Sequence, residues 1–175
     1  MVIGREQGTG NRERLTSNMQ TTPSLEKRIW EALETVEDPE IPISVTDLGL
    51  IQKVTISGSS VRVRMIPTYS ACPAIEVMRQ DIRRRLLAIP EVDHVEVELS
   101  FEQPWTIDRM SERGRQRLVE HGLSMPTKLR IESVECPFCG STNTVLENQF
   151  GPTLCRAIHY CNNCRNPIER FKSPA

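Results

Sequence analysis

The sequence lacks an excess of charge of either sign and lacks long apolar runs. Its 22 basic and 23 acidic residues nearly cancel, so no global field would attract nucleic acid or acidic membranes. No segment approaches the roughly 20 consecutive apolar residues of a membrane helix. Residues 1–22 also lack the apolar core of a secretory signal. We therefore expect a cytoplasmic protein with neither a nucleic acid nor a membrane as partner.

Motifs of several enzyme classes are missing too. The chain has no Gly-rich phosphate loop, no Ser-His-Asp pattern and no pair of helical Glu-x-x-His motifs for a di-iron centre. We expect no independent catalysis by this chain.

Four of the six cysteines form two close pairs, Cys136-Pro-Phe-Cys139 and Cys161-Asn-Asn-Cys164. One such turn supplies two thiolates, and a second turn brought back by a hairpin completes a tetrahedral site. Without an export signal, metal ligation is a better explanation of the cysteines than disulfides. Structural zinc suits this donor set, while an iron site and a redox thiol pair are the alternatives. So small a module needs its metal to fold.

Cys155 and His159 lie between the two pairs. Either residue could replace a ligand. The simpler interpretation makes Cys155 a small buried side chain and His159 a surface residue.

The periodicity upstream predicts an α+β domain. Helical spacing predicts helices over about 24–36 and 73–89, the second with a buried stripe of Ile75, Met78, Ile82 and Leu86. Alternating apolar residues predict strands over about 50–56, 61–65 and 95–101, with a hairpin turn at 57–60. Helices on one face of a small mixed sheet would bury this pattern.

A third helix is expected over about 108–121, followed by a linker over 123–134. The predicted organisation is a disordered leader (1–22), the α+β domain (23–104), a helix and linker (105–134) and a zinc-ribbon module (135–175).

Cys72 precedes Pro73 at the start of the predicted second helix, where the first amides and the helix dipole favour a thiolate. The loops expected nearest to it carry Asp38, Glu40 and Asp47. Carboxylates beside a thiol favour transient metal ligation and oppose its activation as a nucleophile. A buried, inert cysteine is the alternative.

Three separated segments resemble the signature of the MIP18 family (domain of unknown function 59). They are Asp38-Pro-Glu-Ile-Pro, Val45-Thr-Asp-Leu-Gly-Leu-Ile51 and Thr68-Tyr-Ser-Ala-Cys-Pro73. This resemblance covers about residues 24–101 and implies a role in iron–sulfur cluster assembly. Pro104-Trp-Thr-Ile-Asp108, Met110-Ser-Glu112 and the cysteine pairs narrow it to the D-subunit family of phenylacetyl-CoA oxygenase (epoxidase) systems.

The resemblance implies roles for particular residues. It makes Cys72 the reactive or cluster-contacting cysteine and places Glu40, Asp47 and Thr68 on the same patch. It also implies an accessory or maturation protein that handles iron or an iron–sulfur cluster. The expected partners are the oxygenase and reductase subunits, and possible further ones are the iron–sulfur assembly machinery.

Other functions compete with this one. A zinc-containing scaffold that binds oxygenase subunits, with an inert Cys72, is the main alternative. A nucleic-acid-binding ribbon conflicts with the near-neutral charge, and a thiol oxidoreductase lacks its βαβ setting.

Arg109, Arg113 and Arg117 recur every four residues on the predicted third helix. They form either a solvated edge beside the apolar stripe of Ile107, Met110, Gly114 and Leu118, or a basic face that docks on an acidic oxygenase surface.

Overall fold

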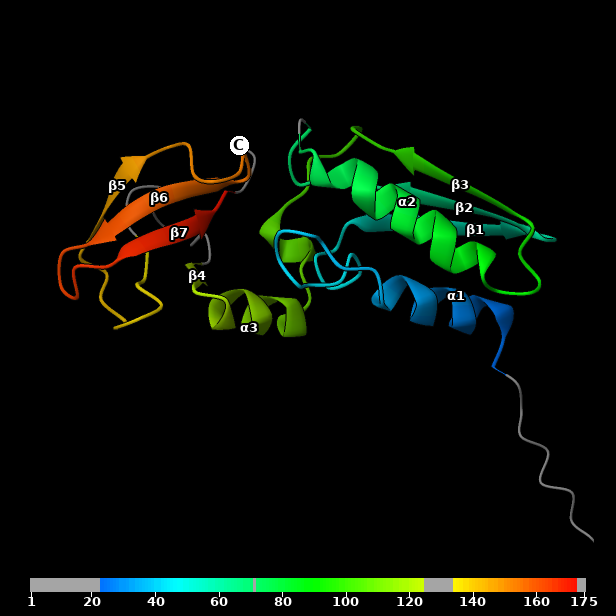
Figure 1. Cartoon of the computed structure of the whole chain (residues 1–175), viewed down its shortest axis with the longest axis horizontal. Coiled ribbons are helices and arrows are strands. Elements are labelled where there is room, and N and C mark those ends of the chain that lie inside the picture. Colours follow the sequence, from blue (N-terminus) through cyan, green and yellow to red (C-terminus); the bar gives the residue numbers. More distant parts are fainter. Residues whose placement is uncertain (1–22, 71, 125–133, 173–175) are drawn as a thin grey trace, which may run out of the picture.

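The computed structural model describes residues 23–70, 72–124 and 134–172 (Figure 1). The leader predicted over 1–22 lies outside these residues. The elements are, in order, α1 (Leu25–Glu34), β1 (Ile51–Ser57), β2 (Ser60–Met65), α2 (Ala74–Leu87), β3 (His94–Leu99), the 3-10 turn η1 (Ile107–Arg109), α3 (Glu112–Glu120), β4 (Leu123–Ser124), β5 (Thr144–Asn148), β6 (Arg156–Cys161) and β7 (Pro167–Phe171). They form two sheets, ordered β1-β2-β3 and β4-β7-β6-β5. The predicted α+β class is confirmed.

The first sheet is mixed, as predicted. β1 and β2 form an antiparallel hairpin, and β2 pairs in parallel with β3 after the crossover through α2. Gly58 adopts φ +60° in the hairpin turn, a conformation that glycine reaches without steric cost. Phe101, expected at the end of β3, instead lies beyond the strand and is exposed.

The two longer helices cover one face of this sheet (Figure 1). The predicted stripe of Ile75, Met78, Ile82 and Leu86 on α2 is buried. α1 begins at Ser24, whose hydroxyl accepts a hydrogen bond from the Lys27 amide at 3.3 Å. Ile29 and Leu33 of α1 complete the same core.

The third helix is shorter than predicted and is broken at its start. Met110 and Ser111 are extended, so Arg109 lies on η1 and α3 begins only at Glu112. The Ser111 hydroxyl accepts the Gly114 amide at 3.0 Å and caps the new helix. The three arginines therefore do not share one helical face.

The second sheet is the zinc ribbon, with β6 antiparallel to both β5 and β7. Leu123 and Ser124, expected in the linker, form β4 and pair with β7. The rest of the predicted linker, 125–133, lies outside the described residues.

One continuous core joins the two sheets. Trp105 packs edge-to-face on Phe171, with ring centroids 5.5 Å apart and an interplanar angle of 67°. The Trp105 indole donates a hydrogen bond to the Leu48 carbonyl at 2.7 Å. Trp105 thus links the first domain to the last strand of the ribbon. No helix among the described residues is long and apolar enough to span a membrane.

Candidate functional site

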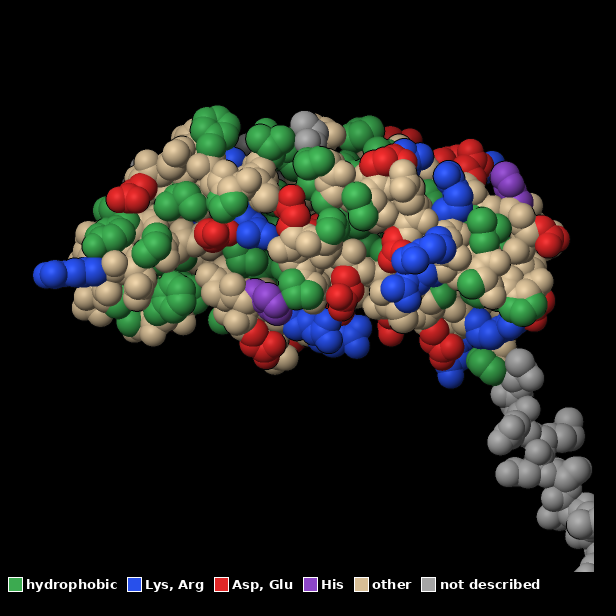
Figure 2. Space-filling model, in the orientation of Figure 1, with side chains coloured by type: hydrophobic (Ala, Val, Ile, Leu, Met, Phe, Trp, Pro, Cys, Tyr) green, Lys and Arg blue, Asp and Glu red, His purple; other side chains and the backbone are tan. Residues whose placement is uncertain are grey.

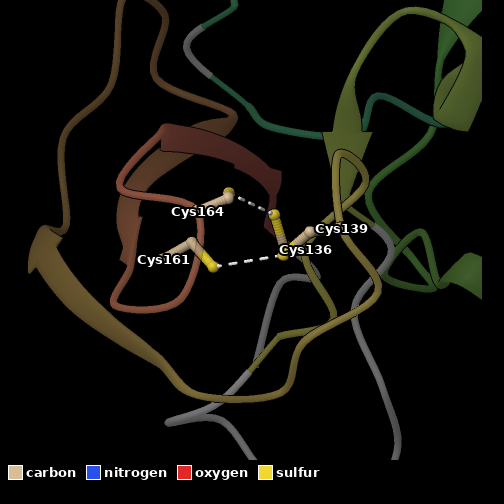
Figure 3. Close-up of side chains that lie close together, drawn as sticks. All are labelled: Cys136, Cys139, Cys161 and Cys164. Carbon is tan, nitrogen blue, oxygen red and sulfur yellow. Dashed lines mark hydrogen bonds between the residues drawn. The ribbon is translucent and has the colours of Figure 1, made fainter.

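The four paired cysteines converge on one point, as the spacing predicts. Cys136 and Cys139 come from the turn before β5, and Cys161 and Cys164 from the turn between β6 and β7 (Figure 3). Their sulfurs all lie within 4.8 Å of one another. The Sγ atoms of Cys136 and Cys164 are 3.5 Å apart, and those of Cys139 and Cys161 are 3.6 Å apart.

Both cysteine turns have the same backbone geometry. The Gly140 amide donates to the Cys136 carbonyl at 2.8 Å, and the Arg165 amide donates to the Cys161 carbonyl at 2.9 Å. The residue after each pair is left-handed, with φ +69° at Gly140 and +63° at Arg165. Arg165 adopts this angle without being glycine, so the second turn accepts a local strain that the first avoids.

Hydrogen bonds prepare the exposed side of this site for thiolates. The Asn163 side chain donates to Cys139 Sγ at 3.5 Å and, with a backbone amide, lowers the pKa of Cys139 to about 6. Burial works against a low pKa at Cys164, but an amide at Asn166 and the neighbouring thiols outweigh it. Burial raises the pKa of Cys136 to about 12. A soft dication would supply the charge that lets all four sulfurs ionise, so the donor set fits a tetrahedral metal.

His159 is not a surface residue, which corrects the simpler interpretation given above. It is 0% exposed on β6, between Leu146 of β5 and Ile168 of β7. Neither ring nitrogen has a hydrogen-bond partner in the described part of the chain. Burial, together with the charge of Arg170, lowers its pKa and keeps the ring neutral. His159 is also outside the group of gathered metal ligands.

Cys72 lies immediately before α2 and is 9% exposed. Its amide donates to the Tyr69 carbonyl at 3.2 Å. Burial raises the pKa of the Cys72 thiol, and the nearby Cys155, Asp38 and Glu40 raise it further. The thiol is therefore neutral at ordinary pH and is not an activated nucleophile.

Glu40 lies in the same charged neighbourhood as Cys72, in a loop held by its own backbone. Asp38 Oδ1 accepts the amides of Glu40 at 2.8 Å and Ile41 at 3.3 Å. Burial raises the pKa of Asp38 despite these bonds. Asp38 was expected near Cys72, but Cys155 was not, since it is 83 positions away in the sequence.

Asp47 faces α3. Its carboxylate accepts the Ser111 hydroxyl at 2.6 Å and Arg113 Nε at 2.7 Å, and the residue is 5% exposed. Burial tends to raise the pKa of Asp47, but the Ser111 and Arg113 hydrogen bonds outweigh it and hold the pKa below its usual value. Contact between Asp47 and a cluster stays a prediction.

Thr68, the fourth predicted site residue, lies on the loop that leads to Cys72. It lines a cavity of about 280 Å³ with Tyr69, Phe101 and Trp105.

The arginines of the predicted docking face are largely engaged within the chain. Arg113 pairs with Asp47, Arg117 lies 3.7 Å from Glu37, and Arg109 Nε donates to the Gly49 carbonyl at 3.0 Å. On the face shown in Figure 2, basic and acidic side chains are interspersed over the helices. This arrangement favours the interpretation as a solvated edge.

Two protein families match successive parts of the chain. Residues 26–99 match the family described as "Iron-sulfur cluster assembly protein", and residues 124–172 match the "PaaD zinc beta ribbon domain". The second match covers the four gathered cysteines.

Individual relatives agree with both matches. The chain is 38% identical to the D subunit of the putative 1,2-phenylacetyl-CoA epoxidase of Escherichia coli, over 82% of this chain and 90% of the relative. An "Fe-S protein maturation auxiliary factor" of Porphyromonas gingivalis is 39% identical over 53% of this chain and 90% of that protein. A solved domain of unknown function 59 from Bacillus anthracis aligns with 54% of this chain and 91% of its own, at 30% identity and a TM-score of 0.52. The chain therefore belongs to the family of putative 1,2-phenylacetyl-CoA epoxidase D subunits, and joins an iron–sulfur cluster assembly domain to a PaaD zinc beta ribbon.

Proposed function

We propose that this protein is an accessory maturation factor of a phenylacetyl-CoA epoxidase. It would help to assemble iron or an iron–sulfur cluster on an oxygenase or reductase component of that system. The main support is the position of Cys72, a thiol beside Asp38 and Glu40 within the matched assembly domain. Thiolate and carboxylate donors together suit iron that must be bound and then released.

The ribbon has a different role in this proposal. Its four sulfurs form a closed site that leaves no position for substrate or water, which is typical of structural zinc. Zinc there would fix the ribbon, and the ribbon would hold the Cys72 loop and bind the oxygenase components.

Maturation of a client tests the proposal. The epoxidase components are produced with the wild-type chain, with Cys72→Ser or without the chain, and client iron content and epoxidation rate are measured. We expect Cys72→Ser to lose most of the gain that the wild-type chain gives. Ser59→Ala, in the turn between β1 and β2, is the control and should behave as wild type.

Equal maturation by wild type and Cys72→Ser would reject the proposal. If both then also raised the activity above that of components produced without the chain, the scaffold function would be supported instead.

A further inference from the structure

Two buried thiols from different domains lie together where the sheets meet. Cys72 precedes α2 of the assembly domain, and Cys155 directly precedes β6 of the ribbon. Figure 1 shows the start of β6 facing the first turn of α2. Both residues belong to the same buried cluster, with exposed fractions of 9% and 5%. Neither is one of the four cysteines of the ribbon site.

Several bonds fix Cys155 in this position. The Lys172 amide donates to the Cys155 carbonyl at 2.7 Å, and the Thr153 hydroxyl lies 3.1 Å from its sulfur. The next residue, Arg156, donates one hydrogen bond to the Glu40 carbonyl at 3.0 Å and another to Glu169 at 2.7 Å. The guanidinium of Arg156 thus ties the ribbon to the acidic loop beside Cys72.

The surroundings of the two thiols are acidic. Burial raises the pKa of Cys155, and Glu40 and Asp38 add to this effect. The same carboxylates and Cys155 itself act on Cys72 in the same direction. Arg156 is a nearby cation, but it is already paired with Glu169. A bound metal cation would relieve the mutual repulsion of these acidic groups.

We propose that Cys72 and Cys155 form a two-thiolate half-site that holds iron across the domain boundary. The iron is either a Fe²⁺ ion or one iron of an iron–sulfur cluster. This inference rests on the proposed function, whose site it extends by one ligand from the ribbon. Each iron bound displaces the two thiol protons to solvent, so binding tightens as the pH rises.

A half-site suits a protein that passes its cargo on. Among the described residues, the four ribbon cysteines alone gather three or more ligand atoms within 4.8 Å of one another. Asp38 and Glu40 therefore do not complete a closed cage around the two thiols. Coordination positions are left for a donor or a client, which would take the iron by supplying more ligands.

Iron binding to zinc-loaded protein without oxygen tests the inference. Wild type, Cys155→Ser, Cys72→Ser and the control Thr153→Val are titrated with Fe²⁺ alone or with sulfide, and retained iron and zinc are measured. We expect each serine variant to bind iron at least about tenfold more weakly while keeping its zinc. Thr153→Val retains both thiols and should bind as wild type does. Iron retained without sulfide identifies the ion, and iron retained only with sulfide identifies a cluster.

Normal binding by Cys155→Ser with loss in Cys72→Ser would overturn the inference and leave the proposed function intact. Normal binding by both variants would overturn both. A second measurement needs no variant: dibromobimane fluoresces only after it alkylates two neighbouring thiols. Zinc-loaded wild type should yield a Cys72–Cys155 crosslinked peptide, and its absence after complete reaction of both thiols would overturn the inference.

Discussion

Among single residues, Asp47 joins α3 to the core of the first domain. Its buried carboxylate accepts bonds from Ser111, the cap of α3, and from Arg113 on that helix. The α3 side chains converge on it from the segment that leads to the ribbon. Asp47 therefore has a structural role whether or not it also contacts a cluster.

Replacing Asp47 with asparagine should lower the free energy of unfolding by about 1–3 kcal/mol at neutral pH. Hydrogen bonds to a charged group contribute about that much, and the exposed Arg113 adds little more. Urea unfolding of wild type and Asp47→Asn measures the difference.

The pH dependence of that difference has a defined sign. Because the folded pKa of Asp47 is lowered, the carboxylate stabilises the fold fully above the ordinary aspartate pKa of about 4. This contribution declines as the pH falls below that value and through the folded pKa. The two proteins should therefore converge in stability in acid, and a difference that stayed constant would contradict the assignment.

Among the elements, α3 depends on a close approach at Gly114. A Cβ there would lie 2.7 Å from the Asp47 carbonyl oxygen and 3.0 Å from the Met110 side chain. Backbone oxygen cannot move as a flexible side chain can, so this glycine lets the helix lie directly on the Asp47 loop.

Gly114→Ala should therefore destabilise the protein although alanine is the better helix former. Alanine gains about 1 kcal/mol in helix propensity, whereas overpacking costs about 1–3 kcal/mol. We expect a net loss of about 1–2 kcal/mol in thermal or urea unfolding. Gln116→Ala, exposed on the same helix, should change stability by less than about 0.5 kcal/mol. Stabilisation by Gly114→Ala would show that α3 does not pack this closely.

The elements differ in how far the sequence predicts them. Local periodicity was sufficient for α2 and for the β1–β2 hairpin, because each satisfies its own hydrogen bonds and presents one apolar face. The break before α3 was missed, since Ser111 is held by Asp47, 64 positions earlier. The cysteine pairs were predictable from spacing, because a tetrahedral metal dictates it. His159 was misplaced because its burial depends on strand pairing with β5 and β7, which local sequence does not encode.

At the scale of the whole molecule, the ribbon and the assembly domain share one core through Trp105 and Phe171. The ribbon's own cluster is small, containing Val134, Cys136, Cys161 and Ile168. Such a core is too small to hold the sheet without its metal. The metal thus also supports the surface on which Trp105 rests.

Removing the metal with a strong chelator under reducing conditions should unfold the ribbon and expose Trp105. In Trp30→Phe protein, emission reports on Trp105 alone and should shift to the red, with strand signal lost in circular dichroism. Amide exchange in α2 should stay slow, since its core lies on the first sheet. Added zinc should reverse these changes, and unchanged emission after complete metal loss would contradict this account.

The central claim is that Cys72 handles iron in a chain whose ribbon carries zinc. The most direct test is the zinc, iron and acid-labile sulfide content of wild type and Cys72→Ser, both purified without oxygen. Our account predicts about one zinc per chain in both proteins, with iron in wild type that is absent from the mutant and sulfide alongside it if the cargo is a cluster. Zinc in both proteins and equal iron, or no iron in either, would contradict it.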